Sequence, residues 1–148
     1  MTLWNRFSDG ERVALDTSVF IYYFNRQQPY FAPCLQLIRS IESGQLRAVI
    51  STVSEMEILV EPLAQGRHEL VNDIEDLLRR LTSLDVVAVD RALARRAAQL
   101  RAETRLRSLD ALVAVTAIAS GCSHLVGNDR EFASRVKGVD YVMVADYV

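Results

Sequence analysis

Four acidic residues stand near the ends of predicted strands, where their carboxylates could act together on one substrate. Asp16 directly follows one short apolar segment, and Asp129 follows another. Asp110 and Glu57 lie in the first turns of predicted helices. In an open parallel sheet, ligands bind in the crevice beyond the carboxyl ends of the strands. We therefore expect these carboxylates to face a common crevice.

Carboxylates that converge on one crevice indicate a bound cation. Like charges at short distance repel one another strongly unless a cation lies between them. Ligands that are all oxygen suit Mg²⁺ or Mn²⁺ better than zinc. Such ions, single or paired, can activate water and stabilise charge on a phosphodiester. The pattern therefore indicates metal-dependent hydrolysis of a phosphodiester bond.

Each acid also has a structural explanation, which the sequence leaves open. Asp16 is of the residue type favoured at a helix N-cap. The helix macrodipole stabilises any acid placed, like Asp110, in a first turn. Asp129 could cap its own helix. Alternatively, Asn128 caps that helix with Glu131 as its partner in a capping box, which would release Asp129 for other work.

Glu57 competes with Glu55 for the same role. Thr52 and Glu55 have the spacing of a capping box, and so do Ser54 and Glu57. Residues two positions apart on a helix point to nearly opposite sides, so only one of these glutamates can face the crevice. The spacing alone does not say which one it is.

Short apolar segments alternate with longer helical patterns along the chain. Strands are predicted at residues 12–15, 46–50, 84–89, 124–126 and 141–144. Helices are predicted from residue 17, after residue 90, and at residues 30–43, 52–63, 67–81, 108–120 and 129–135. This alternation predicts an α/β fold, with a central, mainly parallel sheet of about four to five strands flanked by helices. No linker or repeat interrupts the chain, so we expect a single domain over residues 1–148.

Arginine supplies almost all the basic charge, and it is concentrated in one segment. The whole chain has a net charge of -2. Within residues 91–107 the only acid is Glu103, and the arginines there are Arg91, Arg95, Arg96, Arg101, Arg105 and Arg107. Such a segment forms either a solvated helix face or a surface that contacts phosphates or a partner. Arg105 and Arg107 directly precede Asp110 and are candidate contacts for RNA phosphates.

The remaining features indicate a soluble, cytoplasmic protein. Cys34 and Cys122 show neither a disulfide framework nor zinc-ligand spacing. Residues 1–11 lack the apolar core of a signal peptide. The longest apolar stretches, such as residues 111–119, are too short to span a bilayer.

Four segments of the chain resemble, in order, the four conserved blocks of PIN-domain ribonucleases, in particular the VapC-like toxins of bacterial toxin–antitoxin pairs. The segments are VALDTSVFIYYF (13–24), VISTVSEMEIL (49–59), RSLDALVAVTAIASG (107–121) and HLVGNDREF (124–132). Together they cover nearly the whole chain. The second block carries a Glu before an apolar pair, and this alignment selects Glu57 over Glu55.

The resemblance implies a PIN-like three-layer fold and a ribonuclease that uses Mg²⁺ or Mn²⁺. It implies that the catalytic and metal-binding acids are Asp16, Glu57, Asp110 and Asp129. It makes Ser18 a possible polar helper near the metal. It further implies an RNA substrate, a homodimer, and a cognate antitoxin that inserts a segment into the active site.

One position departs from the resemblance and keeps alternatives open. Family members usually carry Thr or Ser two residues before the fourth acid, and this chain has Gly127 there. A hydroxyl that could hold a water of the metal is therefore missing. The alternatives are a PIN-fold RNA-processing nuclease that is not a toxin, and a binding or regulatory PIN domain with weak or lost catalysis. A phosphatase of the haloacid-dehalogenase kind is disfavoured because it needs an acid where Ser18 stands.

Overall fold

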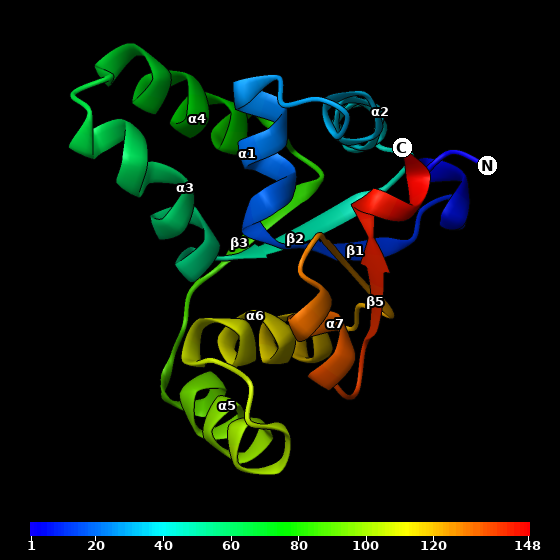
Figure 1. The fold of residues 1–148 in the computed structure, drawn as a ribbon, viewed down its shortest axis with the longest axis vertical. Coiled ribbons are helices and arrows are strands. Elements are labelled where there is room, and N and C mark those ends of the chain that lie inside the picture. Colours follow the sequence, from blue (N-terminus) through cyan, green and yellow to red (C-terminus); the bar gives the residue numbers. More distant parts are fainter.

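A five-stranded parallel sheet forms the centre of the computed structural model, which describes residues 1–148 (Figure 1). The strands are β1 (Arg12–Leu15), β2 (Arg47–Ser51), β3 (Leu84–Val87), β4 (His124–Gly127) and β5 (Asp140–Met143). Their order in the sheet is β3-β2-β1-β4-β5, and every neighbouring pair is parallel. The predicted α/β fold with a parallel sheet is confirmed.

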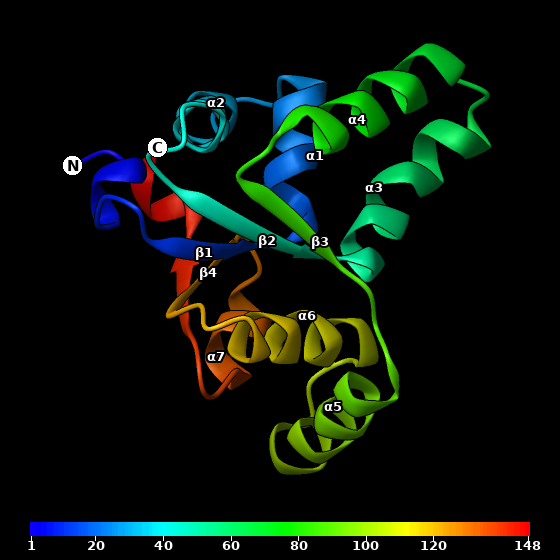
Figure 2. The ribbon, with the colours of Figure 1, turned by 180° about the vertical axis from the view of Figure 1, so that it is seen from behind.

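Helices cover both faces of the sheet and complete a three-layer fold (Figures 1 and 2). One face carries α1 (Thr17–Asn25), α2 (Phe31–Glu42), α3 (Thr52–Ala64) and α4 (His68–Arg80). The other face carries α5 (Arg91–Thr104), α6 (Ser108–Ala119) and α7 (Arg130–Arg135). Short 3-10 helices lie at the two ends of the chain, η1 (Trp4–Arg6) and η2 (Val144–Tyr147).

The strands supply side chains alternately to two hydrophobic cores. Val13 and Leu15 of β1 pack into the core beneath α1, α2 and α4, whereas Ala14 packs into the core with α5 and α6. The same alternation holds for β2 and β4, because successive side chains of a strand point to opposite faces. A sheet buried on both faces needs apolar residues at nearly every strand position. This requirement explains the short apolar segments of the sequence.

The order of the strands places a topological switch point between β1 and β4. The chain adds β2 and β3 on one side of β1 and then adds β4 and β5 on the other. Leu15 is the register partner of Val126, and the backbone N–H of Asp16 donates to the Val126 carbonyl at 2.8 Å. The segments that follow β1 and β4 therefore leave the sheet side by side. Ligands of open parallel sheets bind at such a point.

The element boundaries differ from the sequence-based expectation mainly at β3. The predicted strand extends to residue 89, but β3 ends at Val87. Beyond it, the Val89 backbone N–H donates to the Thr52 hydroxyl at 3.3 Å, so it is not available for a sheet neighbour. The other strands agree to within one residue. Gly44 follows the last residues of α2 with φ +82°, as a glycine at a helix end should.

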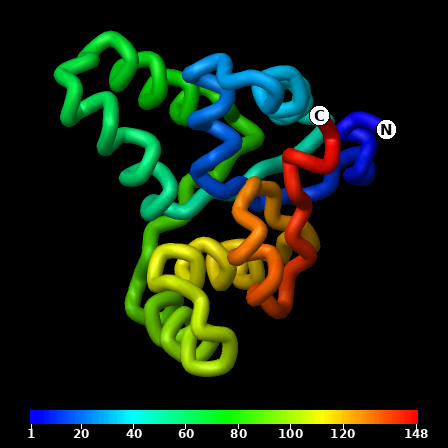
Figure 3. The backbone as a smooth tube through the Cα atoms, viewed as in Figure 1, coloured from blue at the N-terminus to red at the C-terminus, as the bar shows by residue number.

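The two termini lie close together at one edge of the molecule (Figure 3). Leu3 and Phe7 near the start of the chain are buried in the same core as Val144 near its end. Both cysteines are buried and unpaired. No helix is both long enough and apolar enough to cross a membrane.

Candidate active site

Asp16 is the N-cap of α1, and its capping role occupies only one of its carboxylate oxygens. Oδ1 accepts a hydrogen bond from the Thr17 backbone N–H at 2.8 Å. The other oxygen has no hydrogen-bond partner in the protein, so it can contact a ligand. The two explanations of Asp16, as cap and as ligand, are therefore compatible.

The charges of the other predicted acids reach Asp16. Its pKa is raised to about 6: burial raises it most, the Thr17 hydrogen bond lowers it, and the negative charges of Asp110, Glu57 and Asp129 raise it in that order. Acids that share a site disfavour one another's ionisation in this way. The structure thus places the three other predicted acids near enough for their charges to act on Asp16, at the carboxyl end of β1.

Glu57 is turned toward the end of β1 by a hydrogen bond from α1. The Thr17 hydroxyl donates to Glu57 Oε1 at 3.0 Å. Neither capping box that the spacing allowed is formed at this helix. Ser51 caps α3 instead, and the Thr52 hydroxyl accepts from the backbone N–H of Val89. Thr17 is a site residue that sequence reasoning missed, because nothing local links it to a glutamate 40 positions away.

Asp129 caps α7, which overturns the alternative in which Asn128 does so. Asp129 Oδ1 accepts from the Phe132 backbone N–H at 3.0 Å. The Asn128 amide does not bond to α7. It donates to the Tyr22 hydroxyl at 3.0 Å and accepts from the Ala145 backbone N–H at 2.9 Å. As at Asp16, the cap uses one carboxylate oxygen and leaves the other for a further contact.

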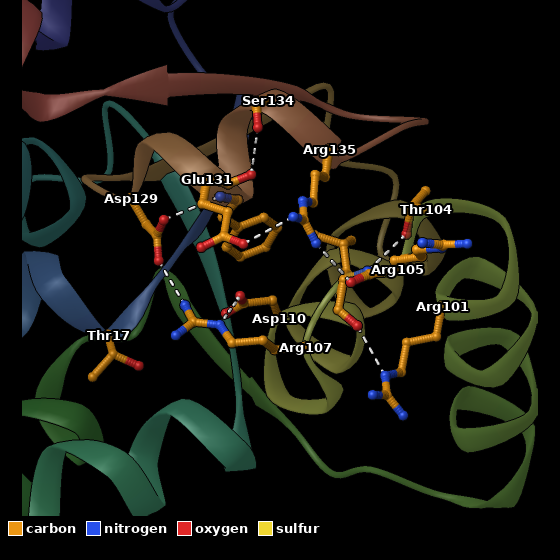
Figure 4. Close-up of polar contacts among 12 residues, drawn as sticks. Thr17, Arg101, Thr104, Arg105, Arg107, Asp110, Asp129, Glu131, Ser134 and Arg135 are labelled. Carbon is orange, nitrogen blue, oxygen red and sulfur yellow. Dashed lines mark hydrogen bonds and ion pairs between the residues drawn. The ribbon is translucent and has the colours of Figure 1, made fainter.

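Arg107 lies between two of the acids and bonds to both (Figure 4). Its Nε donates to Asp110 Oδ2 at 2.9 Å, and its NH2 group donates to Asp129 Oδ2 at 2.7 Å. Asp110 is the more buried acid, with a side chain 15% exposed against 35% for Asp129. Burial raises the pKa of Asp110, although the hydrogen bond and the charge of Arg107 both lower it. The guanidinium therefore offsets part of the repulsion between the acids.

The loop between α5 and α6 holds Arg107 in this place (Figure 4). Arg101 Nε donates to the Leu106 carbonyl at 2.8 Å, and Arg135 NH1 donates to the Arg105 carbonyl at 3.1 Å. Arg105 itself adopts a left-handed conformation with φ +60° and ends α5. Of the two arginines expected to contact phosphates, Arg105 is exposed on this loop and Arg107 is engaged with the acids.

The residues suit a hard divalent cation by their chemistry, although they are not preformed around one. No three His, Cys, Asp or Glu side chains are close enough together to hold a metal ion as they stand. The available donors are carboxylate oxygens, which Mg²⁺ and Mn²⁺ prefer. The Ser18 hydroxyl, in the first turn of α1, is buried without a hydrogen-bond partner. A buried hydroxyl of this kind is normally satisfied by water or a ligand, so Ser18 has unused bonding capacity near the acids.

Tyr141 is a second residue that sequence reasoning missed. A Cβ atom at Gly127 would overlap the Tyr141 hydroxyl and would lie 2.8 Å from Tyr141 Cζ and 3.1 Å from Asp16 Cβ. The hydroxyl accepts a hydrogen bond from the Asp129 backbone N–H at 3.2 Å. The signal in the sequence was Gly127 itself, a small residue where the resemblance implies a hydroxyl.

The model of the PIN domain family matches residues 13–138 of this chain. No curated protein matches its sequence. The fold is similar to that of the DNA-bound VapBC of Salmonella typhimurium, with 19% identity, a TM-score of 0.70, and coverage of 90% of this chain and 98% of that chain.

Two further solved structures show the same likeness. VapC20 of Mycobacterium tuberculosis, described as a sarcin–ricin loop cleaving toxin, has 17% identity and a TM-score of 0.68, covering 86% of this chain and 98% of that one. VapBC2 of Rickettsia felis, bound to a DNA fragment of its promoter, has 19% identity and a TM-score of 0.63, covering 89% and 98%. The shared fold is the one that the four sequence blocks imply.

Proposed function

Because the chain belongs to the PIN domain family, we propose that it is a metal-dependent endoribonuclease and the toxin of a toxin–antitoxin pair. The observation that carries this proposal is the grouping of Asp16 with Glu57, Asp110 and Asp129 at the carboxyl end of β1. Ligand sites of open parallel sheets occur at this position. Carboxylates grouped there need a cation to balance their charge.

In this proposal the four acids would hold Mg²⁺ or Mn²⁺, which would supply a lowered pKa for an attacking water and positive charge to balance the phosphodiester. Asp16 is oriented by the Thr17 backbone N–H, and Glu57 by the Thr17 hydroxyl. The Ser18 hydroxyl is the polar helper, since it is buried and has no other partner. Arg107 would have to release Asp110 and Asp129 for these acids to hold the ion, and its side chain, 66% exposed, would then be free to contact a phosphate of the substrate.

The reaction that these residues support is hydrolysis by in-line displacement. The oxygen of water adds to phosphorus as the bond from phosphorus to the 3′ oxygen breaks. The proton lost by the water ends on the departing 3′ oxygen. One fragment therefore carries a 3′-hydroxyl and the other a 5′-phosphate. The acids supply orientation and charge balance, and they form no covalent bond to the substrate.

RNA is the proposed substrate because a basic surface adjoins the acids. All six arginines of residues 91–107 are exposed, on α5 and on the loop that leads to Asp110. Arginines placed in this way attract a phosphate backbone even though the chain as a whole is acidic. Arg105 and Arg107 lie at the end of this surface that is nearest the acids.

The proposed partners are a cognate antitoxin and a second copy of the chain. A pocket of about 250 Å³ between α1, α3 and α4 has both apolar residues and Glu57 in its lining, so a segment bound there would reach the acids. Met56, Val60 and Leu63 of α3 are at least half exposed, as apolar residues of a protein interface are before association. We place the protein in the cytoplasm, as one domain over residues 1–148.

RNA cleavage with and without metal tests the proposal. We expect the wild-type protein to cleave RNA in Mg²⁺ or Mn²⁺, and Asp16→Asn to lose at least about a hundredfold in rate, because asparagine keeps the helix cap but not the charge. Glu75→Gln, which removes an exposed charge on α4, is the matched control and should retain full activity. Wild-type cleavage that persists in excess EDTA would show that the proposal is wrong.

A binding or regulatory domain with weak catalysis is the second candidate function. The contact of Arg107 with Asp110 and Asp129 favours it, because an internal cation already offsets part of the charge of the acids. Calorimetric titration with Mn²⁺ separates the two functions, since only the nuclease should bind the ion well. Growth arrest on expression, relieved by a co-expressed neighbouring gene, would distinguish a toxin from an RNA-processing nuclease.

A further inference from the structure

Tyr141 extends toward the candidate site from β5, an edge strand of the sheet. It lies on β5 opposite Leu125 of β4, so it is a diagonal neighbour of Gly127 on the same face of the sheet. Its ring packs against Phe132 with the centroids 5.0 Å apart. The hydroxyl end of the side chain lies above Gly127, beside the Cβ of Asp16.

Glycine at position 127 fits because the Tyr141 side chain occupies the space that a Cβ atom would take, and not because the backbone needs a positive φ. Its φ lies outside the left-handed region that favours glycine, unlike those of the other five glycines. Any side chain at this position would collide with the Tyr141 hydroxyl and the ring carbon that bears it. Gly127 and Tyr141 therefore form a complementary pair, in which the absence of one side chain makes room for the end of the other.

The Tyr141 hydroxyl lies between the backbone of Asp129 and the space over Gly127. It accepts the Asp129 backbone N–H at 3.2 Å. Like any tyrosine hydroxyl at neutral pH, it carries its proton. This is the only hydrogen bond that the structure records for it, and a tyrosine hydroxyl can donate one more. A free donor is thus available next to the backbone of Asp129, on the side of the sheet where Asp16 follows β1.

We propose that Tyr141 is a positioning residue of the candidate active site, whose hydroxyl takes the place of a side chain at position 127. It holds the backbone of Asp129 and donates a hydrogen bond to the oxygens that surround a bound divalent cation. The proposal deepens the proposed nuclease function and rests on it. Groups that orient the ligands of a metal in this way commonly change its affinity by about ten- to a hundredfold.

Tyr141→Phe tests the hydroxyl while keeping the ring. We expect this variant to bind Mn²⁺ at least about tenfold more weakly in calorimetry, with the packing on Phe132 retained. Tyr147→Phe is the matched control, since Tyr147 is another half-buried tyrosine of the C-terminal segment. The control should bind Mn²⁺ as the wild type does.

A second set of variants moves the hydroxyl from residue 141 to residue 127. It tests whether Tyr141 acts through its hydroxyl or only through the packing of its ring. Tyr141→Leu removes both the hydroxyl and the obstruction above Gly127, and it should also weaken Mn²⁺ binding. Adding Gly127→Ser to Tyr141→Leu should restore most of the affinity, whereas adding Gly127→Ala should not. In the wild-type background, Gly127→Ser should lower the melting temperature, because the new side chain meets the tyrosine.

The outcomes distinguish failure of the Tyr141 proposal from failure of the nuclease proposal on which it rests. Wild-type affinity for Mn²⁺ in Tyr141→Phe, or equal rescue by serine and alanine, would overturn the role of Tyr141 and leave the nuclease proposal standing. Absence of Mn²⁺ binding and of RNA cleavage in the wild type would overturn both.

Discussion

The Asp16 carboxylate caps a helix and still has one oxygen free for a chemical task. Its Oδ1 caps α1, and the group as a whole lies among three other acids. Asp129 shows the same division, with Oδ1 capping α7 and Oδ2 bonded to Arg107. A carboxylate has two oxygens, so a cap does not exclude a ligand. The choice between cap and ligand that the sequence left open was therefore not a real alternative.

The raised pKa of Asp16 predicts a pH-dependent stability. Its pKa of about 6 in the folded protein exceeds the unfolded value of 3.8, so the folded state binds the proton more tightly between these values. The contribution of protonated Asp16 to the free energy of unfolding is fully present below pH 3.8 and is lost as the pH rises through about 6. Without metal, Asp16→Asn should therefore be more stable than the wild type at pH 8, by up to about 3 kcal/mol.

Urea unfolding of both proteins at pH 4 and pH 8, in EDTA, measures this difference. The two proteins should be equally stable at the lower pH, where Asp16 is protonated in the folded state. Adding Mn²⁺ at the higher pH should stabilise only the wild type, because the cation balances the ionised acids. A difference in stability that is the same at both pH values would contradict the assignment.

At the scale of elements, the loop between α5 and α6 carries the arginine that bonds to two of the acids. Arg101 and Arg135 bond to two of its carbonyls and so fix the position from which Arg107 extends. The contacts of Arg107 cross from this loop to the start of α7, which is otherwise joined to the sheet through β4 and β5. Three elements that meet at the switch point are thus linked by one exposed side chain.

Arg107 and a divalent cation should compete for the same carboxylate oxygens. We therefore expect Arg107→Gln to raise the affinity for Mn²⁺ by about two- to fivefold, a modest factor because exposed ion pairs are weak. Calorimetry at constant ionic strength measures the change. Arg130→Gln removes an equal charge from an exposed side chain that bonds to neither acid, so it separates competition from a general charge effect. Equal affinities of the two variants would show that Arg107 does not compete.

At the scale of the whole molecule, charge is distributed unevenly around a nearly neutral total. The net charge is -2, whereas the arginines of α5 and its following loop form a basic surface on the face that also carries α6 and α7. Screening by salt confines the attraction of such a surface to its neighbourhood. Binding of RNA should therefore depend on where an arginine lies and not only on the total charge.

Paired substitutions on opposite faces test this expectation. Arg95→Ala with Arg96→Ala, on α5, should weaken RNA binding and reduce its salt dependence by the loss of up to two phosphate contacts. Arg79→Ala with Arg80→Ala, on α4, changes the total charge equally and should leave binding nearly unchanged. Fluorescence anisotropy with labelled RNA over a range of salt concentrations measures both effects. Equal losses in the two double variants would exclude α5 as the RNA surface.

The amino-acid sequence by itself determined the elements, the parallel sheet and the positions of Asp16, Asp110 and Asp129 at strand and helix ends. These features depend on neighbours in the chain: apolar runs, helical spacing, and capping residues such as Asp90, whose carboxylate accepts a hydrogen bond from the Leu93 backbone N–H. The choice of Glu57 over Glu55 needed the resemblance to a family, because their spacing was equivalent.

Only the tertiary structure decided what the acids contact. Thr17 bonds to Glu57 across 40 positions, and Arg107 bonds to Asp129 across 22. Tyr141 reaches Gly127 because β5 pairs with β4, a neighbour relation that depends on the strand order of the folded sheet. Patterns along a chain report local conformation, whereas these contacts depend on which elements the packing of two cores brings together. Asp16 was therefore a candidate from its place after a strand, and its partners became known only from the fold.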